Sequence, residues 1–292
     1  MANTATNYPI YRRVYVWEWA VRFFHWVNAV CIVVLGVTGY LIGEPMKIFT
    51  SSEAYKQHWF GIVRFIHFTA AYIFVFNILF RIYWAFVGNK FARWYNFVPY
   101  TKENYKEIAE VLKVDFFQID PSEKISFGHN SWAGFNFLLL MLASVFQILS
   151  GFALYAPMSS ISFPRLIGTF VAGVGCILIG LYIYKKLYLT HGKYKVTLIK
   201  SIIAGLISFF ILYFAVSYSL LGVCYLFKLL MNSEQTIRWW HHLMLWYFVV
   251  FTIIHVYLTF YHDYIEGRGT VSSMVGGWKF SKKNIDDIKK TR

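Results

Sequence analysis

The sequence predicts an all-α integral membrane protein with six spans, built around a four-helix bundle. Three observations predict this class. The 292-residue chain is 58% hydrophobic and 21% aromatic, with a mean hydropathy of +0.48, which is unusual for a water-soluble domain. Histidines recur inside its apolar runs. Runs of about 18 or more apolar residues are typical of membrane-spanning helices, and six are found at 20–43, 62–87, 132–155, 164–184, 198–230 and 239–262.

The six runs predict one membrane domain over residues 1–292. The first run is too long for a cleaved signal peptide, and no small-residue cleavage site follows it before "GEPMK". We expect a core bundle, an inserted helix pair and a cytoplasmic tail, at 14–156 with 235–265, at 157–234 and at 266–292 respectively.

The net charge of +14 is distributed as in a membrane protein. With six spans and a cytoplasmic N-terminus, most of the 28 lysines and arginines fall on cytoplasmic segments. Trp17, Trp19, Trp84 and Trp94 lie at span ends, where aromatic belts form. We therefore expect both termini in the cytoplasm of a bacterium, a chain integral to the inner membrane in contact with lipid, and no binding of nucleic acid.

Four histidines inside the spans form two levels of depth. His25 and His255 lie near the cytoplasmic ends of their spans, whereas His67 and His241 or His242 lie near the external ends. An ionisable residue within a span is a functional hypothesis by default. Because a haem held between helices needs axial nitrogens from facing side chains, the pairing predicts two b-type haems. No CxxCH motif for covalent haem attachment occurs.

Helix geometry favours His241 over His242 as the ligand. His241 and His255 are 14 residues apart, a rise of about 21 Å, and share a face because 14 residues come within about 40° of whole turns. His242 points nearly the opposite way. We expect it to face a partner subunit or a haem propionate.

An R-x-x-H pattern precedes three of the histidines. Arg22, Arg64 and Arg238 each lie one turn nearer the membrane surface than their histidine. Guanidinium groups bind carboxylates, which favours contact with haem propionates, although arginines also anchor span ends. Gly39 shares the face of His25 at the depth of the other haem, where its missing side chain would admit a porphyrin.

Five segments then show a resemblance: "RFFHWVNAVCIVVLGVTGYLIG", "RFIHFTAAYIFVFNILFRIYW", "GHNSWAGFNFLLLMLASVFQILSGFALY", "IRWWHHLMLWYFVVFTIIHVYLTFYHD" and "GTVSSMVGGWKF". They resemble the cytochrome b subunit of membrane-bound nickel–iron hydrogenases and, more distantly, the gamma subunit of formate dehydrogenase. The resemblance implies a dihaem protein that passes electrons from a periplasmic hydrogenase, with small and large subunits, to menaquinone or ubiquinone. It also implies that His25, His67, His241 and His255 are the axial ligands.

The segment 157–234 departs from this pattern, because two further spans stand where a short external loop is expected. An even number of added spans preserves the topology. We expect the pair to pack on the bundle or to bind lipid or a neighbouring protein.

The quinone is expected at the cytoplasmic end, near His25 and His255. The third span begins there with "GHNSWAGFN", in which His129, Asn130 and Asn136 could hydrogen-bond a quinone carbonyl and His129 could supply a proton. Asn130 or Ser131 could instead cap the helix.

Other functions stay open on the sequence alone. The same haem sites would serve an anchor for a formate or thiosulfate oxidoreductase, and a haem-free scaffold or transporter would pack its histidines as polar residues. The cysteines, Cys31, Cys176 and Cys224, all lie in spans and form no set for nickel or iron–sulfur clusters. The chain is therefore not expected to oxidise hydrogen by itself, and would act as the electron-transfer subunit of a complex.

Overall fold

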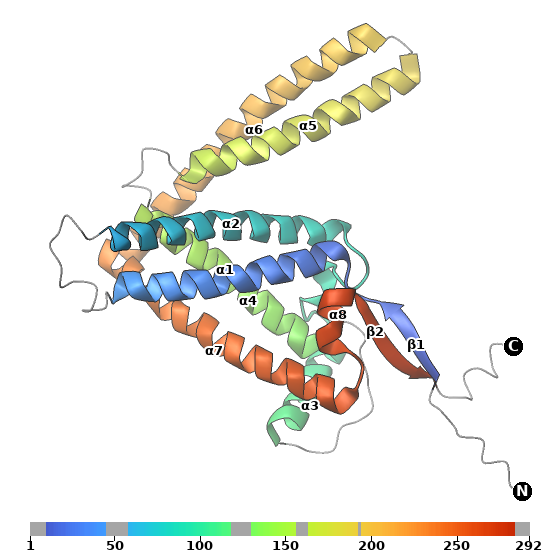
Figure 1. Cartoon of the computed structure of the whole chain (residues 1–292). Coiled ribbons are helices and arrows are strands. Elements are labelled where there is room, and N and C mark those ends of the chain that lie inside the picture. Colours follow the sequence, from blue (N-terminus) through green and yellow to red (C-terminus); the bar gives the residue numbers. More distant parts are fainter. Residues whose placement is uncertain (1–9, 45–57, 118–129, 156–162, 192–193, 284–292) are drawn as a thin grey trace, which may run out of the picture. The chain divides into compact units, whose positions relative to one another are not determined.

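The computed structural model describes residues 10–44, 58–117, 130–155, 163–191 and 194–283. This part of the chain contains eight α-helices, a 3₁₀ turn and two short strands (Figure 1). The elements are β1 (Ile10–Tyr15), α1 (Trp19–Gly43), α2 (Trp59–Val87), η3 (Trp94–Asn96), α3 (Lys102–Phe117), α4 (Ser131–Tyr155), α5 (Phe163–His191), α6 (Tyr194–Met231), α7 (Glu234–Glu266), α8 (Thr270–Gly276) and β2 (Trp278–Lys283).

Five of the helices are long and apolar enough to cross a membrane: α1, α2, α4, α6 and α7. The sixth apolar run lies in α5, where the apolar part, Ile167–Ile183, is shorter. The helix itself continues to His191. Many large apolar side chains on these helices are exposed, as expected where hydrocarbon rather than water surrounds a helix.

The chain divides into two compact units. The first comprises 1–145 and 244–292, and the second comprises 146–243. The boundaries fall within α4 and α7, so each of these helices contributes residues to both units.

In the first unit, α1 and α2 pack side by side (Figure 1). The carboxylate of Glu18, just before α1, accepts hydrogen bonds from the Trp84 indole at 2.8 Å and from the Asn89 backbone N–H at 2.9 Å. These bonds fix the start of α1 against the end of α2. A buried cluster of Leu140 and Ala143 on α4 with Phe248 on α7 joins these helices, and Ile32 of α1 packs against it.

The predicted all-α class misses a small sheet in the same unit. Strands β1 and β2 pair antiparallel, with Ile10 opposite Lys283 and Tyr15 opposite Trp278. Gly277 turns the chain from α8 into β2 at φ 85°, a left-handed conformation that favours glycine. The Trp26 indole donates to the Met274 carbonyl of α8 at 3.0 Å. The sheet and α8 therefore hold the two ends of the described chain beside the first turns of α1.

In the second unit, α5 and α6 form an antiparallel pair (Figure 1). Small residues let the two backbones approach closely, as is common between membrane helices. A Cβ added at Gly168 would lie 2.0 Å from the Ser217 hydroxyl, and one added at Gly205 would lie 3.0 Å from the Cys176 sulfur. This packing explains why glycines interrupt both apolar runs.

Candidate functional site

His25 and His255 come together in the first unit. Their ring centroids are 6.2 Å apart, and the ring planes are tilted by 52°. Phe251, one turn earlier on α7, stacks on His255 at 5.6 Å with nearly parallel planes. The Nδ1 atom of His25 is buried and has no hydrogen-bond partner in the structure. Two imidazoles from different membrane helices thus lie close together, with no hydrogen bond between them among the contacts of the described chain.

His67, also in the first unit, contacts two consecutive residues of α1. Its Nδ1 atom lies 2.9 Å from the Thr38 hydroxyl. A Cβ added at Gly39 would lie 3.3 Å from His67 Cε1. Gly39 therefore makes room for the imidazole of His67, which is a more direct role than the porphyrin clearance expected from the sequence.

His241, in the second unit, has a similar environment on α4. Its Nδ1 atom lies 2.8 Å from the Ser150 hydroxyl. A Cβ added at Gly151 would lie 3.0 Å from His241 Cε1. The Gln147 amide nitrogen lies 3.4 Å from His241 Nε2 and donates to the His241 carbonyl at 3.1 Å. The His242 ring lies 6.3 Å from that of His241 and is turned by 72°, so the two side chains point differently, as the helix geometry predicts.

Thr38 and Ser150 were missed by the sequence reasoning. A signal was present: a hydroxyl residue, a glycine and an aromatic residue occur in succession at 38–40 and again at 150–152. In each case the hydroxyl and glycine positions meet a histidine of another helix. The pattern is short, and hydroxyl residues are common in membrane helices.

The family model described as "Prokaryotic cytochrome b561" matches residues 16–277. The chain belongs to this family. The matched range includes every histidine discussed above and most of the described structure. Membership implies that the protein is a membrane cytochrome with b-type haem, as the resemblance predicted.

Several relatives of this cytochrome have been named. A protein of Azotobacter chroococcum is 33% identical over 276 residues, covering 94% of this chain and 91% of the relative. One of Cupriavidus necator is 33% identical over 274 residues, covering 93% and 88%. Both are named "Probable Ni/Fe-hydrogenase B-type cytochrome subunit". A protein of Escherichia coli K12, named "Probable Ni/Fe-hydrogenase 1 B-type cytochrome subunit", is 30% identical over 270 residues, covering 92% and 91%.

The separation of His25 and His255 fits two imidazoles that would hold one haem iron between them. Two metal–nitrogen bonds of about 2 Å each, with the half-widths of two imidazole rings, require a centroid separation of about 6 Å. The observed separation is 6.2 Å. Residues of the cytochrome that would hold haem are therefore present in a suitable arrangement at this level.

The arginines of the three R-x-x-H patterns differ in their surroundings. The Arg22 guanidinium donates to the Val275 carbonyl at the end of α8, while its buried Nε atom has no hydrogen-bond partner in the structure. Arg64 lies over the Phe68 ring at 5.8 Å, and Arg238 is exposed. In the structure Arg22 thus ties α1 to α8, and its contact with a propionate stays a prediction.

The expected quinone residues fall partly outside the described chain. His129 is among the residues that the structure leaves undescribed. The Asn130 side-chain oxygen accepts from the Ala133 N–H at 2.7 Å, so Asn130 caps α4, the alternative that the sequence left open. The Asn136 amide donates to the Trp132 carbonyl of its own helix at 2.9 Å.

A buried arginine near the start of α1 was also missed as a site residue. Arg81 on α2 is 3% exposed, and one of its nitrogens donates to the Ala92 carbonyl at 3.2 Å. The rings of Phe97 and Phe137 lie 4.9 and 5.0 Å from its guanidinium carbon. Aromatic faces therefore stabilise a cation that the sequence reasoning left without a role.

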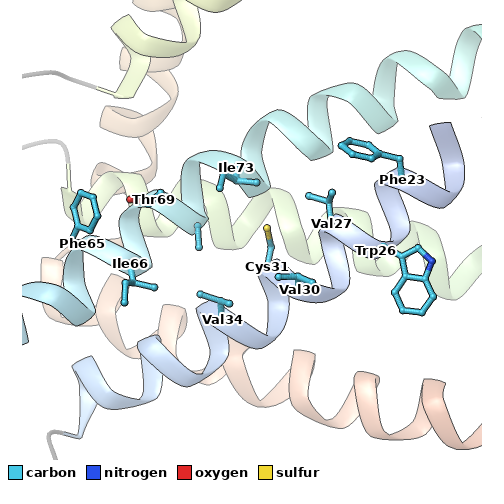
Figure 2. Close-up of a pocket in the computed structure, with 11 residues that line it drawn as sticks. Phe23, Trp26, Val27, Val30, Cys31, Val34, Phe65, Ile66, Thr69 and Ile73 are labelled. Carbon is cyan, nitrogen blue, oxygen red and sulfur yellow. The ribbon is translucent and has the colours of Figure 1, made fainter. Parts of the chain in front are cut away.

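The pocket between α1 and α2 is a separate feature (Figure 2). It measures about 610 Å³, and its lining is apolar apart from Trp26, Cys31 and Thr69. Figure 2 shows Val27, Val30 and Ile73 among the side chains of the two helices that line it. This lining offers no imidazole nitrogen to a metal. It is suited to hydrocarbon.

Proposed function

We propose that the protein is the membrane-anchoring dihaem cytochrome b that takes electrons from a periplasmic nickel–iron hydrogenase and passes them to the quinone pool. The observation that carries this proposal is the 6.2 Å separation of the His25 and His255 rings, which come from two different spans. Packed core histidines need no such spacing, whereas an axial pair does.

The second haem in this proposal is held by His67 and His241. Support comes from α7, which is helical without interruption from Glu234 to Glu266, so the 14-residue spacing between His241 and His255 is that of a regular helix. Each of the two outer histidines also packs against a hydroxyl and a glycine. When bound, each haem supplies one-electron storage, and the chain supplies the ligands and their orientation.

The hydrogenase partner is proposed from the names of the relatives and from charge. Lysine and arginine are expected in excess on the cytoplasmic side of the membrane. This excess favours cytoplasmic termini and a six-span topology in the inner membrane. His67 and His241 would then lie on the periplasmic side, where hydrogenase small and large subunits would dock. The second unit, with α5 and α6, would add two peripheral spans that contact lipid or a neighbouring protein.

Quinone reduction is proposed on the opposite side, near His25 and His255. Each quinone takes two electrons and two protons to become quinol, and hydrogen oxidation releases the same numbers. If the protons for quinone reduction are taken from the cytoplasm and those from hydrogen are released outside, turnover would build a membrane potential. This potential stores about 2.3 kcal/mol per elementary charge and 100 mV. His129 would donate hydrogen bonds or a proton to the quinone, and menaquinone and ubiquinone both suit this chemistry.

The experiment is hydrogen-driven quinone reduction by the purified complex, measured beside haem reduction in the same preparation. We expect His129→Ala to leave both haems reducible by hydrogen but to slow their reoxidation by quinone. Normal quinone turnover in this variant would remove His129 from the site. Co-purification of a molybdenum protein instead of a nickel protein would favour the formate or thiosulfate anchor, and absence of reduced b-type bands would leave a haem-free scaffold.

A further inference from the structure

We infer that Thr38 and Ser150 are positioning residues that hold His67 and His241 in one tautomer. Through these hydrogen bonds they lower the reduction potential of the haem bound at His67 and His241. That potential is then below the potential of the haem at His25 and His255. This inference rests on the proposed function, because it needs two haems. It gives a physical reason for the direction of electron flow in that proposal.

The hydrogen atom of Thr38 is already committed. Its hydroxyl lies 2.6 Å from the Val34 carbonyl, one turn earlier on α1. A hydroxyl has one hydrogen to donate, so the Thr38 oxygen must accept at its 2.9 Å contact with His67 Nδ1. Nδ1 then carries the imidazole proton, and Nε2 is the unprotonated nitrogen that can bind iron.

The same reasoning applies to Ser150. Its hydroxyl donates to the Gln147 carbonyl at 3.1 Å and therefore accepts from His241 Nδ1 at 2.8 Å. The Gln147 amide group, a donor, lies 3.4 Å from His241 Nε2, which agrees with an unprotonated Nε2, and iron bound at Nε2 would take the place of this long contact. Ser150 is fully buried, so water does not replace this bond.

The neighbouring glycines restrict the ring positions. Cβ atoms at Gly39 and Gly151 would lie 3.3 and 3.0 Å from the Cε1 atoms of His67 and His241. Each imidazole thus lies against a helix backbone, with its Nδ1 side turned to the hydroxyl. The pair α1 and α2 and the pair α4 and α7 provide the same arrangement. Chance packing at a single site would not produce this repetition.

A bond from Nδ1–H makes the imidazole a stronger electron donor to a metal. A more basic axial ligand stabilises oxidised iron, which lowers the reduction potential. The effect is larger when the acceptor is itself a donor in another hydrogen bond, as both hydroxyls are. Both ligands of the outer haem receive this bond.

The inner level differs at His25. Its Nδ1 atom is buried without a hydrogen-bond partner in the structure. We therefore expect the inner haem to have the higher potential. An electron would then move favourably from the haem at His67 and His241, which is oxidised, to the haem at His25 and His255, which is reduced, and so from the hydrogenase side to the quinone side.

The test is a redox titration of the purified full chain, followed by haem absorbance. Thr38→Val and Ser150→Ala each remove a hydroxyl with little change in size, and each should shift one haem, the lower-potential one, to a higher potential. Thr38→Ser keeps the hydroxyl and should keep the potential of the unmodified protein. Matched controls are Ser144→Ala and Thr169→Val, because both hydroxyls bond only to their own helix among the contacts of the described chain, at 2.7 and 2.8 Å.

Two results would overturn the inference while leaving the dihaem proposal intact. One is retention of haem in Thr38→Val and Ser150→Ala with both potentials unchanged. The other applies if these variants lose haem, and it compares the potentials of the two haems in the unmodified protein. The haem that is missing from His67→Ala must be the one with the lower potential. If it is the one with the higher potential, the inference is overturned. A haem-free unmodified chain would instead reject the proposed function itself.

Discussion

The side-chain amide of Asn77 on α2 donates to the Phe24 carbonyl of α1 at 3.0 Å. Asn77 is 5% exposed, and Phe24 directly precedes His25. This bond fixes the backbone of α1 at the position from which His25 approaches His255. The placement of His25 therefore depends on a contact between α1, which carries it, and α2.

Asn77→Leu should destabilise the inner site. Interhelical hydrogen bonds in membranes contribute about 1 kcal/mol, so we expect a modest fall in the thermal midpoint and a preferential loss of the haem at His25. Thermal unfolding followed by haem absorbance measures both effects. Thr69→Val, at an exposed position of the same helix, is the control. Equal stability of the two variants would show that the Asn77 contact is not needed.

The glycines beside the outer histidines should tolerate no side chain. Gly151→Ala places a Cβ 3.0 Å from His241 Cε1, and Gly39→Ala places one 3.3 Å from His67 Cε1. We expect both to reduce the outer haem content, Gly151→Ala more strongly. Gly61→Ala and Gly222→Ala meet nothing within 4 Å and should be neutral or slightly stabilising. Haem content that falls equally in all four variants would point to a general helix effect.

The choice between adjacent histidines is directly testable. We expect His242→Ala to keep both haems, whereas His241→Ala should lose the outer haem and keep part of the inner one. The haem-to-protein ratio of each variant gives the answer. If the two results are exchanged, the ligand assignment on α7 is wrong.

Arg81 offers a test of its buried charge. It is 3% exposed between Phe97 and Phe137, and replacing a buried charge by an apolar residue of similar length is often tolerated. Arg81→Met should therefore remain closer to the unmodified thermal midpoint than Arg81→Lys, which keeps a charge without the planar guanidinium. Arg93→Met, at an exposed position, is the control. A stable Arg81→Lys beside an unfolded Arg81→Met would mean that the positive charge itself is required.

The sequence predicts the helices well because hydrophobic runs in a membrane chain have few alternatives to a helix. Each expected span lies within an observed helix to within a residue, but α5 and α7 extend further. Helix formation continues into charged segments such as the one at Lys185, whereas hydropathy detects only the apolar part. The strands β1 and β2 were missed because each has six residues and its partner lies at the other end of the chain.

The candidate site was predictable only in part. Histidine depth brings His25 and His255 to one level, and in the structure their ring centroids lie 6.2 Å apart. The contacts of Thr38 and Ser150 were not predictable, since a hydroxyl in a membrane helix usually bonds to its own backbone, as both also do. The bond between Arg22 and α8 depends on tertiary folding of the segment after α7. The assignment of His67 and His241 to one haem stays a prediction.

The haem-to-protein ratio of the purified full chain tests the central claim most directly. Haem b is measured by the pyridine haemochrome spectrum, and protein by amino-acid analysis of the same sample. We expect two haems per unmodified chain, and at most one each in His25→Ala and His67→Ala, with different potentials in the two variants. A ratio of one in the unmodified chain, or loss of the same haem in both variants, would contradict the account.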